Sequence, residues 1–186
     1  MSTSAVVILA VILGIVVGAA LIYFLQRNRT LRLQERFGPE YTRTVSERGD
    51  RWRAESDLER RQRRVEKFRI RPLDSASRAR FEESWRDVQA RFVDNPQGTL
   101  AQADRLIGEV MAAEGYPVQD FEQRAADISV DHPRVVANYR EAHYIAVQHS
   151  QGRASTEDLR RAMIHYRSLF EELIGQPELV RTEGSL

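Results

Sequence analysis

The chain divides into three stretches with different patterns of apolar and polar residues. Residues 5–25 contain no charged or amide side chain, residues 26–71 are charged with scattered apolar positions, and residues 75–174 carry apolar residues at helical spacing. The first pattern is typical of a transmembrane helix, the second of a solvated helix and the third of a helical bundle. Because no segment alternates with a period of two, we predict an all-α protein.

The apolar run at residues 5–25 is long enough to cross a bilayer. At 1.5 Å per residue its 21 positions span about 31 Å, which is the thickness of a hydrocarbon core. A cleaved signal peptide is the alternative, but the leader MSTS has no basic residue, and the run is longer than the apolar region of a typical signal. We therefore predict an N-terminal transmembrane anchor over residues 1–26.

Arginines flank only the C-terminal end of this run, at Arg27, Arg29, Arg32 and Arg36. The positive-inside rule then leaves the N-terminus outside and the rest of the chain in the cytoplasm, which indicates a single-pass membrane protein. The same four arginines follow the apolar run closely enough to contact anionic lipid.

Small residues recur every fourth position within the run, at Ala10, Gly14 and Gly18. Such a ridge lets a second helix approach closely enough for the backbones to pack. We therefore predict a homodimer through the transmembrane helix, with a lipid-facing ridge in a monomer as the alternative.

Residues 27–71 predict a basic juxtamembrane helical stalk, because helix formers dominate and the few apolar residues do not form one stripe. FGPE at 37–40 and RGD at 48–50 are expected to interrupt the helix. Residues 27–80 hold 17 basic and 9 acidic side chains, whereas residues 81–186 hold 11 and 18. Nucleic acid is not the expected partner, since the run RRQRRVEKFRIR has no recognised reader motif around it.

Residues 72–175 predict a bundle of five helices, and residues 176–186 a flexible tail. Within the bundle, apolar residues lie three or four positions apart, and turns such as DNPQG separate the helices. The predicted apolar faces are Phe81, Trp85, Val88 and Phe92; Leu100, Ala103, Ile107, Val110 and Met111; Val118, Phe121, Ala125 and Ile128; Val135, Val136, Tyr139, Ala142, His143 and Ala146; and Leu159, Met163, Tyr166, Phe170 and Leu173.

Capping residues place the start of two helices. In ASTEDL, Ser155 is an N-cap with Asp158 three residues later, which is similar to a capping box. Asp131 is predicted to cap the fourth helix, with Pro133 in the first turn, where its missing N–H costs nothing.

The stretch SVDHPRVVANYREAHYIAVQH, residues 129–149, holds three of the four histidines. A metal site on one helix needs ligands three or four residues apart, but Glu141 and His143 are two apart. His132 lies eleven residues from His143, about 16 Å along a helix axis. We therefore predict no metal, cofactor or catalytic residue, and interpret His143 as a histidine at the edge of the core. The chain has no cysteine, which excludes disulfides and thiolate chemistry.

The strings RFGPEY, IRPL, ARFVDNP, YPVQDFEQRAADISVDHPRVVANYR and STEDLR resemble an uncharacterised family of bacterial proteins. Its members have one N-terminal membrane helix and a cytoplasmic helical domain. The resemblance covers residues 1–174 and, with the orientation given by the flanking arginines, implies a location in the bacterial inner (cytoplasmic) membrane. It implies no activity, cofactor or site residue.

Three functions are open at this point. The first is a membrane-tethered interaction module, in which the bundle holds a cytoplasmic protein partner near the membrane. The second is an enzyme or small-ligand receptor with a site between bundle helices, around His143, Tyr139 and Arg140. The third is a stalk that senses anionic lipid.

Overall fold

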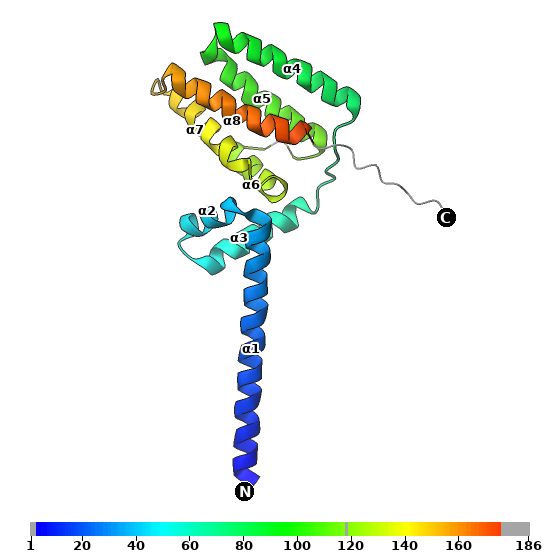
Figure 1. Cartoon of the computed structure of the whole chain (residues 1–186), viewed down its shortest axis with the longest axis vertical. Helices are drawn as coiled ribbons and strands as arrows, with labels where there is room; N and C mark the ends of the chain where they lie inside the picture. The colour runs from blue at the N-terminus through cyan, green and yellow to red at the C-terminus, as the bar shows by residue number, and fades with distance from the viewer. Residues whose placement is uncertain (1–2, 118, 176–186) are drawn as a thin grey trace, which may run out of the picture. The chain divides into compact units, whose positions relative to one another are not determined.

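The computed structural model describes residues 3–117 and 119–175, with side chains from residue 12 onwards. The predicted tail at 176–186 lies outside the described residues. Within these limits the fold is all-α, as predicted (Figure 1). The chain divides into two compact units, with the boundary between Leu58 and Glu59. The helices are α1 (Thr3–Phe37), α2 (Pro39–Arg48), α3 (Arg51–Val65), α4 (Ser75–Asp94), α5 (Pro96–Glu114), α6 (Phe121–Asp131), α7 (Val136–Ser150) and α8 (Thr156–Ile174).

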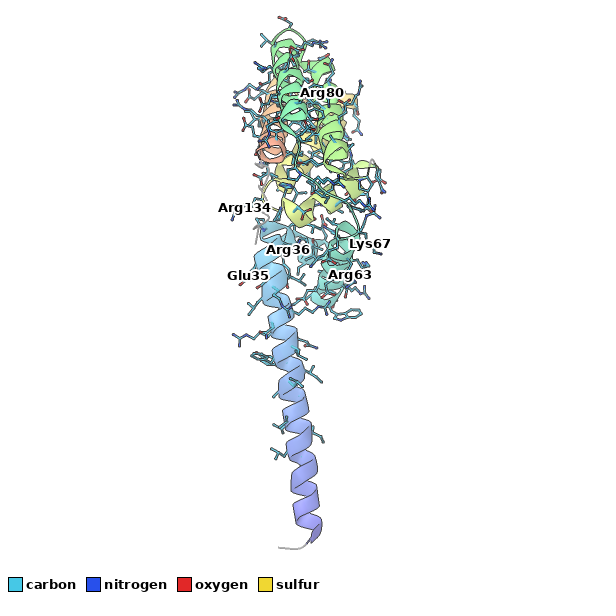
Figure 2. The ribbon with its side chains drawn as sticks, turned by 90° about the vertical axis from the view of Figure 1, so that its right-hand side faces the viewer. Glu35, Arg36, Arg63, Lys67, Arg80 and Arg134 are labelled. Atoms are coloured by element: carbon cyan, nitrogen blue, oxygen red, sulfur yellow. The ribbon has the colours of Figure 1, made fainter. Side chains whose placement is uncertain are left out.

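The first helix, α1, is continuous and contains the predicted membrane-spanning run. From Ile12 to Leu25 its large apolar side chains are exposed, and they project from the helix in several directions (Figure 2). Residues Ile12–Phe37 are long enough and apolar enough to cross a membrane, and the rest of the protein buries no residue of the most apolar 18-residue window. An exposed apolar surface of this extent is typical of contact with lipid or with another apolar surface.

The segment predicted as a stalk is helical, but it folds back on the end of α1 as two short helices. Gly38 and Gly49 have φ angles of 47° and 65°, and they break the helix at the two predicted interruptions. The apolar positions form no single stripe because they belong to separate helices that pack together. The buried apolar residues of this first unit are Leu33, Phe37, Tyr41, Ala54 and Leu58.

The second compact unit begins within α3. Arg64 Nε lies 3.0 Å from Asp127 Oδ1, and the Arg71 backbone N–H donates a hydrogen bond to the Glu114 carbonyl at 2.8 Å. Residues 59–71, which we assigned to the stalk, therefore belong to the same compact unit as the bundle.

Helices α4 to α8 form the predicted five-helix bundle (Figure 1). Helix α5 packs against both α4 and α8, and α7 packs against α8. All described residues of the predicted apolar faces are buried or partly buried, and Trp85 stacks on Phe170 with ring centroids 4.6 Å apart. Val118 lies outside the described residues. The predicted capping box of Ser155 and Asp158 is confirmed at the start of α8.

The predicted start of the fourth bundle helix is wrong. Helix α6 continues through Asp131, Pro133 lies in a turn, and α7 begins only at Val136 without a side-chain cap. The Asp131 carboxylate instead accepts a hydrogen bond from the Tyr116 hydroxyl at 2.8 Å. Because this partner lies 15 residues earlier, a rule based on neighbouring residues could not identify it.

Candidate functional site

A cleft of about 480 Å³ opens on the first compact unit, between α1 and the start of α3. Its volume lies within the range of roughly 300 to 1,000 Å³ that small-ligand sites occupy. Three arginines, two aromatic residues and two carboxylates border the same space. The lining residues are Tyr23, Gln26, Arg27, Arg29 and Thr30 from α1, Asp50 from the preceding turn, and Arg51, Trp52 and Glu55 from α3.

Glu55 holds the wall of the cleft together. Its Oε1 accepts hydrogen bonds from the Thr30 hydroxyl at 2.7 Å, the Tyr41 hydroxyl at 2.9 Å and Arg51 Nε at 3.1 Å. One carboxylate thus joins α1, α2 and α3. Burial alone would raise the pKa of Glu55, but the three donors outweigh burial and hold this pKa below its usual value. The carboxylate is therefore charged at neutral pH and stabilises the cleft.

The turn between α2 and α3 positions the other wall. Gly49 adopts the left-handed conformation that ends α2. The Asp50 carboxylate then accepts a hydrogen bond from the Arg53 backbone N–H at 2.8 Å, which caps the start of α3. Trp52 follows in the first turn and is 68% exposed. Such exposure is unusual, because tryptophan is highly buried on average in folded proteins.

The structure divides the four arginines that were predicted to contact lipid. Arg27 and Arg29 line the cleft, whereas Arg32 and Arg36 do not. With about 100° of rotation per residue, both of the latter lie on the side of α1 away from Thr30, which faces α3. Arg36 is visible near the end of α1 in Figure 2. Only part of the predicted basic flank therefore contributes to this site.

Sequence reasoning missed Arg51 and Trp52, which lie more than 20 residues from Arg29 along the chain. The available signal was the string RGDRW. Its glycine and aspartate break the helix, and an arginine and a tryptophan follow at once. A chain reversal at this point returns these two side chains towards α1.

The predicted glycine ridge lies on an open face of α1. A Cβ atom added to Gly14 or Gly18 would meet no atom within 4 Å, so the helix leaves space for a close neighbour. Ala10 belongs to α1, but its side chain lies outside the described ones. The homodimer stays a prediction.

The histidine-rich stretch contributes to packing in the second unit. The His143 ring stacks on Phe121 with centroids 3.5 Å apart, and burial lowers the pKa of His143. His132 is buried, and its Nδ1 lies 3.2 Å from Glu172 Oε1. Across residues 3–117 and 119–175, no group of three or more potential ligands is arranged to hold a metal ion.

A partly buried polar cluster joins four bundle helices through Asp104, Arg124, Tyr139 and Tyr166. Arg124 Nη2 lies 3.2 Å from Asp104 Oδ2, and the Tyr166 hydroxyl donates to Asp104 at 3.4 Å. The Arg124 guanidinium also lies 5.8 Å from the centre of the Tyr139 ring. Burial raises the pKa of both tyrosine hydroxyls, so both stay protonated at neutral pH and are poor bases. The cluster balances the charge of Arg124 inside the bundle.

Glu114, at the end of α5, has a buried carboxyl group. It is 4% exposed, and its Oε2 has no hydrogen-bond partner within the described part of the chain. Burial is the main cause that raises the pKa of Glu114 to about 7, and the negative charge of Asp131 raises it further. The positive charge of Arg78 lowers this pKa, but by less. This group therefore titrates near neutral pH.

Comparison of the chain with protein-family models, curated proteins and solved structures finds no match. The resemblance to a bacterial membrane-anchored family therefore stays an expectation. Function has to be argued from the geometry of the two units.

Proposed function

We propose that this chain is a single-pass bacterial membrane protein whose bundle holds a cytoplasmic protein partner near the inner face of the cytoplasmic membrane. The observation that carries the proposal is the apolar run of α1, whose large apolar side chains from Ile12 to Leu25 are exposed. Lipid would cover this surface. The bundle has its own apolar core, so it is expected to stay folded beside the membrane while α1 anchors it.

The charges that flank α1 support the orientation. Arg27 and Arg29 follow the apolar run directly, whereas the leader before the run carries no basic side chain. This asymmetry favours an external N-terminus and a cytoplasmic bundle.

The groove between α4 and α5 is the surface that we propose for the partner. It has a volume of about 540 Å³ and a mostly polar lining, since Val88 and Leu106, which also line it, are almost fully buried. Charged side chains around such a groove can pair with complementary groups of a protein partner. The charged lining residues are Asp87, Arg91, Arg105 and Glu109.

Site-specific photo-crosslinking in native membranes tests this proposal. A photoreactive residue replaces Ala101, which is exposed and lines the groove, in the full-length chain. The matched control carries the same residue at the exposed Gln151, beyond α7. We expect an adduct of one defined mass from position 101 and none from position 151. No adduct from position 101, or the same adduct from both positions, would contradict a partner in this groove.

Charge reversal separates the groove from the rest of the bundle surface. Arg91→Glu with Arg105→Glu should abolish the adduct, because both arginines border the groove. Arg160→Glu with Arg167→Glu reverses the same number of exposed charges on α8 and should leave it unchanged. Deleting residues 1–26 should also reduce the adduct, since the partner would then no longer meet the bundle at the membrane. Unchanged crosslinking by the anchorless chain would refute tethering.

A further inference from the structure

We propose that the cleft between α1 and α3 binds the phosphate headgroup of an anionic phospholipid in the leaflet next to the bundle. The inference rests on the membrane span of the proposed function. It adds a specific lipid site, which that function does not require.

The position of the cleft along α1 matches the headgroup layer. The apolar run ends at Leu25, so Arg27 and Arg29 follow it by about 3 and 6 Å along the helix axis. The polar layer on each side of a bilayer is roughly 5 to 7 Å thick. The two arginines therefore lie at the level of the lipid phosphates, and Tyr23 lies in the last turn of the apolar run.

Helix α3 places Trp52 near the same end of the apolar run as Arg27 and Arg29. The hydrogen bond between Thr30 and Glu55 fixes where α3 meets α1. Trp52 lies about one turn before Glu55 and lines the same cleft as Tyr23, which belongs to the apolar run. Aromatic side chains with a polar edge are favoured at this depth, because one side contacts acyl chains and the other contacts water. This placement accounts for the exposed indole ring.

The charges in the cleft suit a phosphodiester. Arg27, Arg29 and Arg51 supply three guanidinium groups, which bind phosphate oxygens with well-matched geometry. Two carboxylates also line the cleft, but Asp50 caps α3 and Glu55 accepts the three hydrogen bonds that join the helices. The formal charge of these five lining side chains is +1, which is opposite to the single negative charge of a headgroup such as phosphatidylglycerol.

Fluorescence quenching of the full-length chain in lipid nanodiscs tests the site. Phosphatidylglycerol with brominated acyl chains is compared with brominated phosphatidylcholine at equal mole fraction. Trp52 is the reporter; Trp85 is buried in the core and is subtracted with a Trp52→Phe variant. We expect brominated phosphatidylglycerol to be enriched at Trp52 by at least about fivefold, the contribution of one basic residue close to an anionic surface. Equal quenching of Trp52 by the two lipids would by itself overturn the proposal.

Two matched double variants distinguish binding of the headgroup in the cleft from general attraction of basic side chains to an anionic membrane surface. Arg27→Gln with Arg51→Gln should abolish the enrichment, whereas Arg32→Gln with Arg36→Gln removes the same charge outside the cleft and should leave it. Equal loss in both double variants would overturn the proposal in favour of surface attraction. Displacement of the lipid by soluble glycerol 3-phosphate at equal concentration would assign the cleft to a soluble phosphate instead.

The same samples distinguish failure of the lipid site from failure of the proposed function. A chain that does not migrate with the nanodiscs contradicts the membrane span and both proposals. A chain that migrates with them but shows equal quenching contradicts only the headgroup site.

Discussion

The buried carboxyl of Glu114 should make the bundle less stable as pH rises towards neutrality. Its pKa is raised from 4.5 to about 7, so the folded state keeps this proton over a range in which the unfolded chain has lost it. The contribution of Glu114 to stability is therefore most favourable below pH 4.5. It declines as pH rises, and the decline is complete above about pH 7.

The size of this effect follows from the two pKa values. The full difference between them corresponds to about 3 kcal/mol of folding free energy. Structural relaxation and water at the edge of the site reduce this value, so we expect about 1–2 kcal/mol. Glu114→Gln keeps the shape of the side chain but cannot ionise. It should therefore stabilise the bundle by about 1–2 kcal/mol at pH 8 and by much less at pH 5.

Denaturant unfolding of the full-length chain in detergent measures this difference. In a Trp52→Phe background, the fluorescence of Trp85 reports only on the bundle, where it stacks on Phe170. Comparing the variant with wild type at each pH cancels the titration of other groups. Glu109→Gln is the matched control, since Glu109 is exposed on the same helix. The reasoning is refuted if the gain from Glu114→Gln is the same at pH 5 and pH 8, or if Glu109→Gln gives an equal change.

Three further predictions follow from burial and contacts. Tyr139→Ala should cost about 3 kcal/mol or more, because it empties a fully buried position. His165→Ala, at a partly exposed position, should cost less than about 0.5 kcal/mol. Equal costs in denaturant unfolding would contradict the helix faces. Gly14→Ile with Gly18→Ile should abolish cross-linking between copies in native membranes without changing insertion, and undiminished cross-linking would leave the ridge facing lipid. Glu55→Ala should speed hydrogen exchange in α2 at least about tenfold while the bundle stays protected. Unchanged exchange in α2 would show that Glu55 does not hold α2 against α1 and α3.

The helices of the bundle could be predicted because their signals are local. Phe81, Trp85 and Val88 share one face through spacing alone, and Ser155 and Asp158 form a capping box within four residues. Burial of such a face depends on the helical period and on the presence of some apolar neighbour. It does not depend on which neighbour that is, so the sequence is sufficient.

The cleft could not be predicted in the same way because it depends on partners distant in sequence. Thr30 meets Glu55 across 25 residues, and Tyr41 joins the same carboxylate from a third helix. The breaks at Gly38 and Gly49 were visible, but the direction in which the chain continues after each break depends on packing. A charged segment with few apolar residues therefore favours the prediction of a stalk. In the structure Tyr41, Ala54 and Leu58 are nevertheless buried in the same compact unit as the end of α1.

The glycine ridge and the contact between α1 and α3 lie on different sides of α1. With about 100° of rotation per residue, Thr30, which contacts α3, lies about 160° around the helix from Gly14 and about 120° from Gly18, whereas Arg29 of the cleft lies within about 60° of both. A second copy that packs only along the apolar run would therefore leave the cleft open to lipid. Arg32 and Arg36 continue the line of the ridge beyond the apolar run, so two parallel copies would bring like charges together there. The dimer contact should therefore be confined to the apolar run, and replacing both glycines with isoleucine should leave lipid quenching at the cleft unchanged.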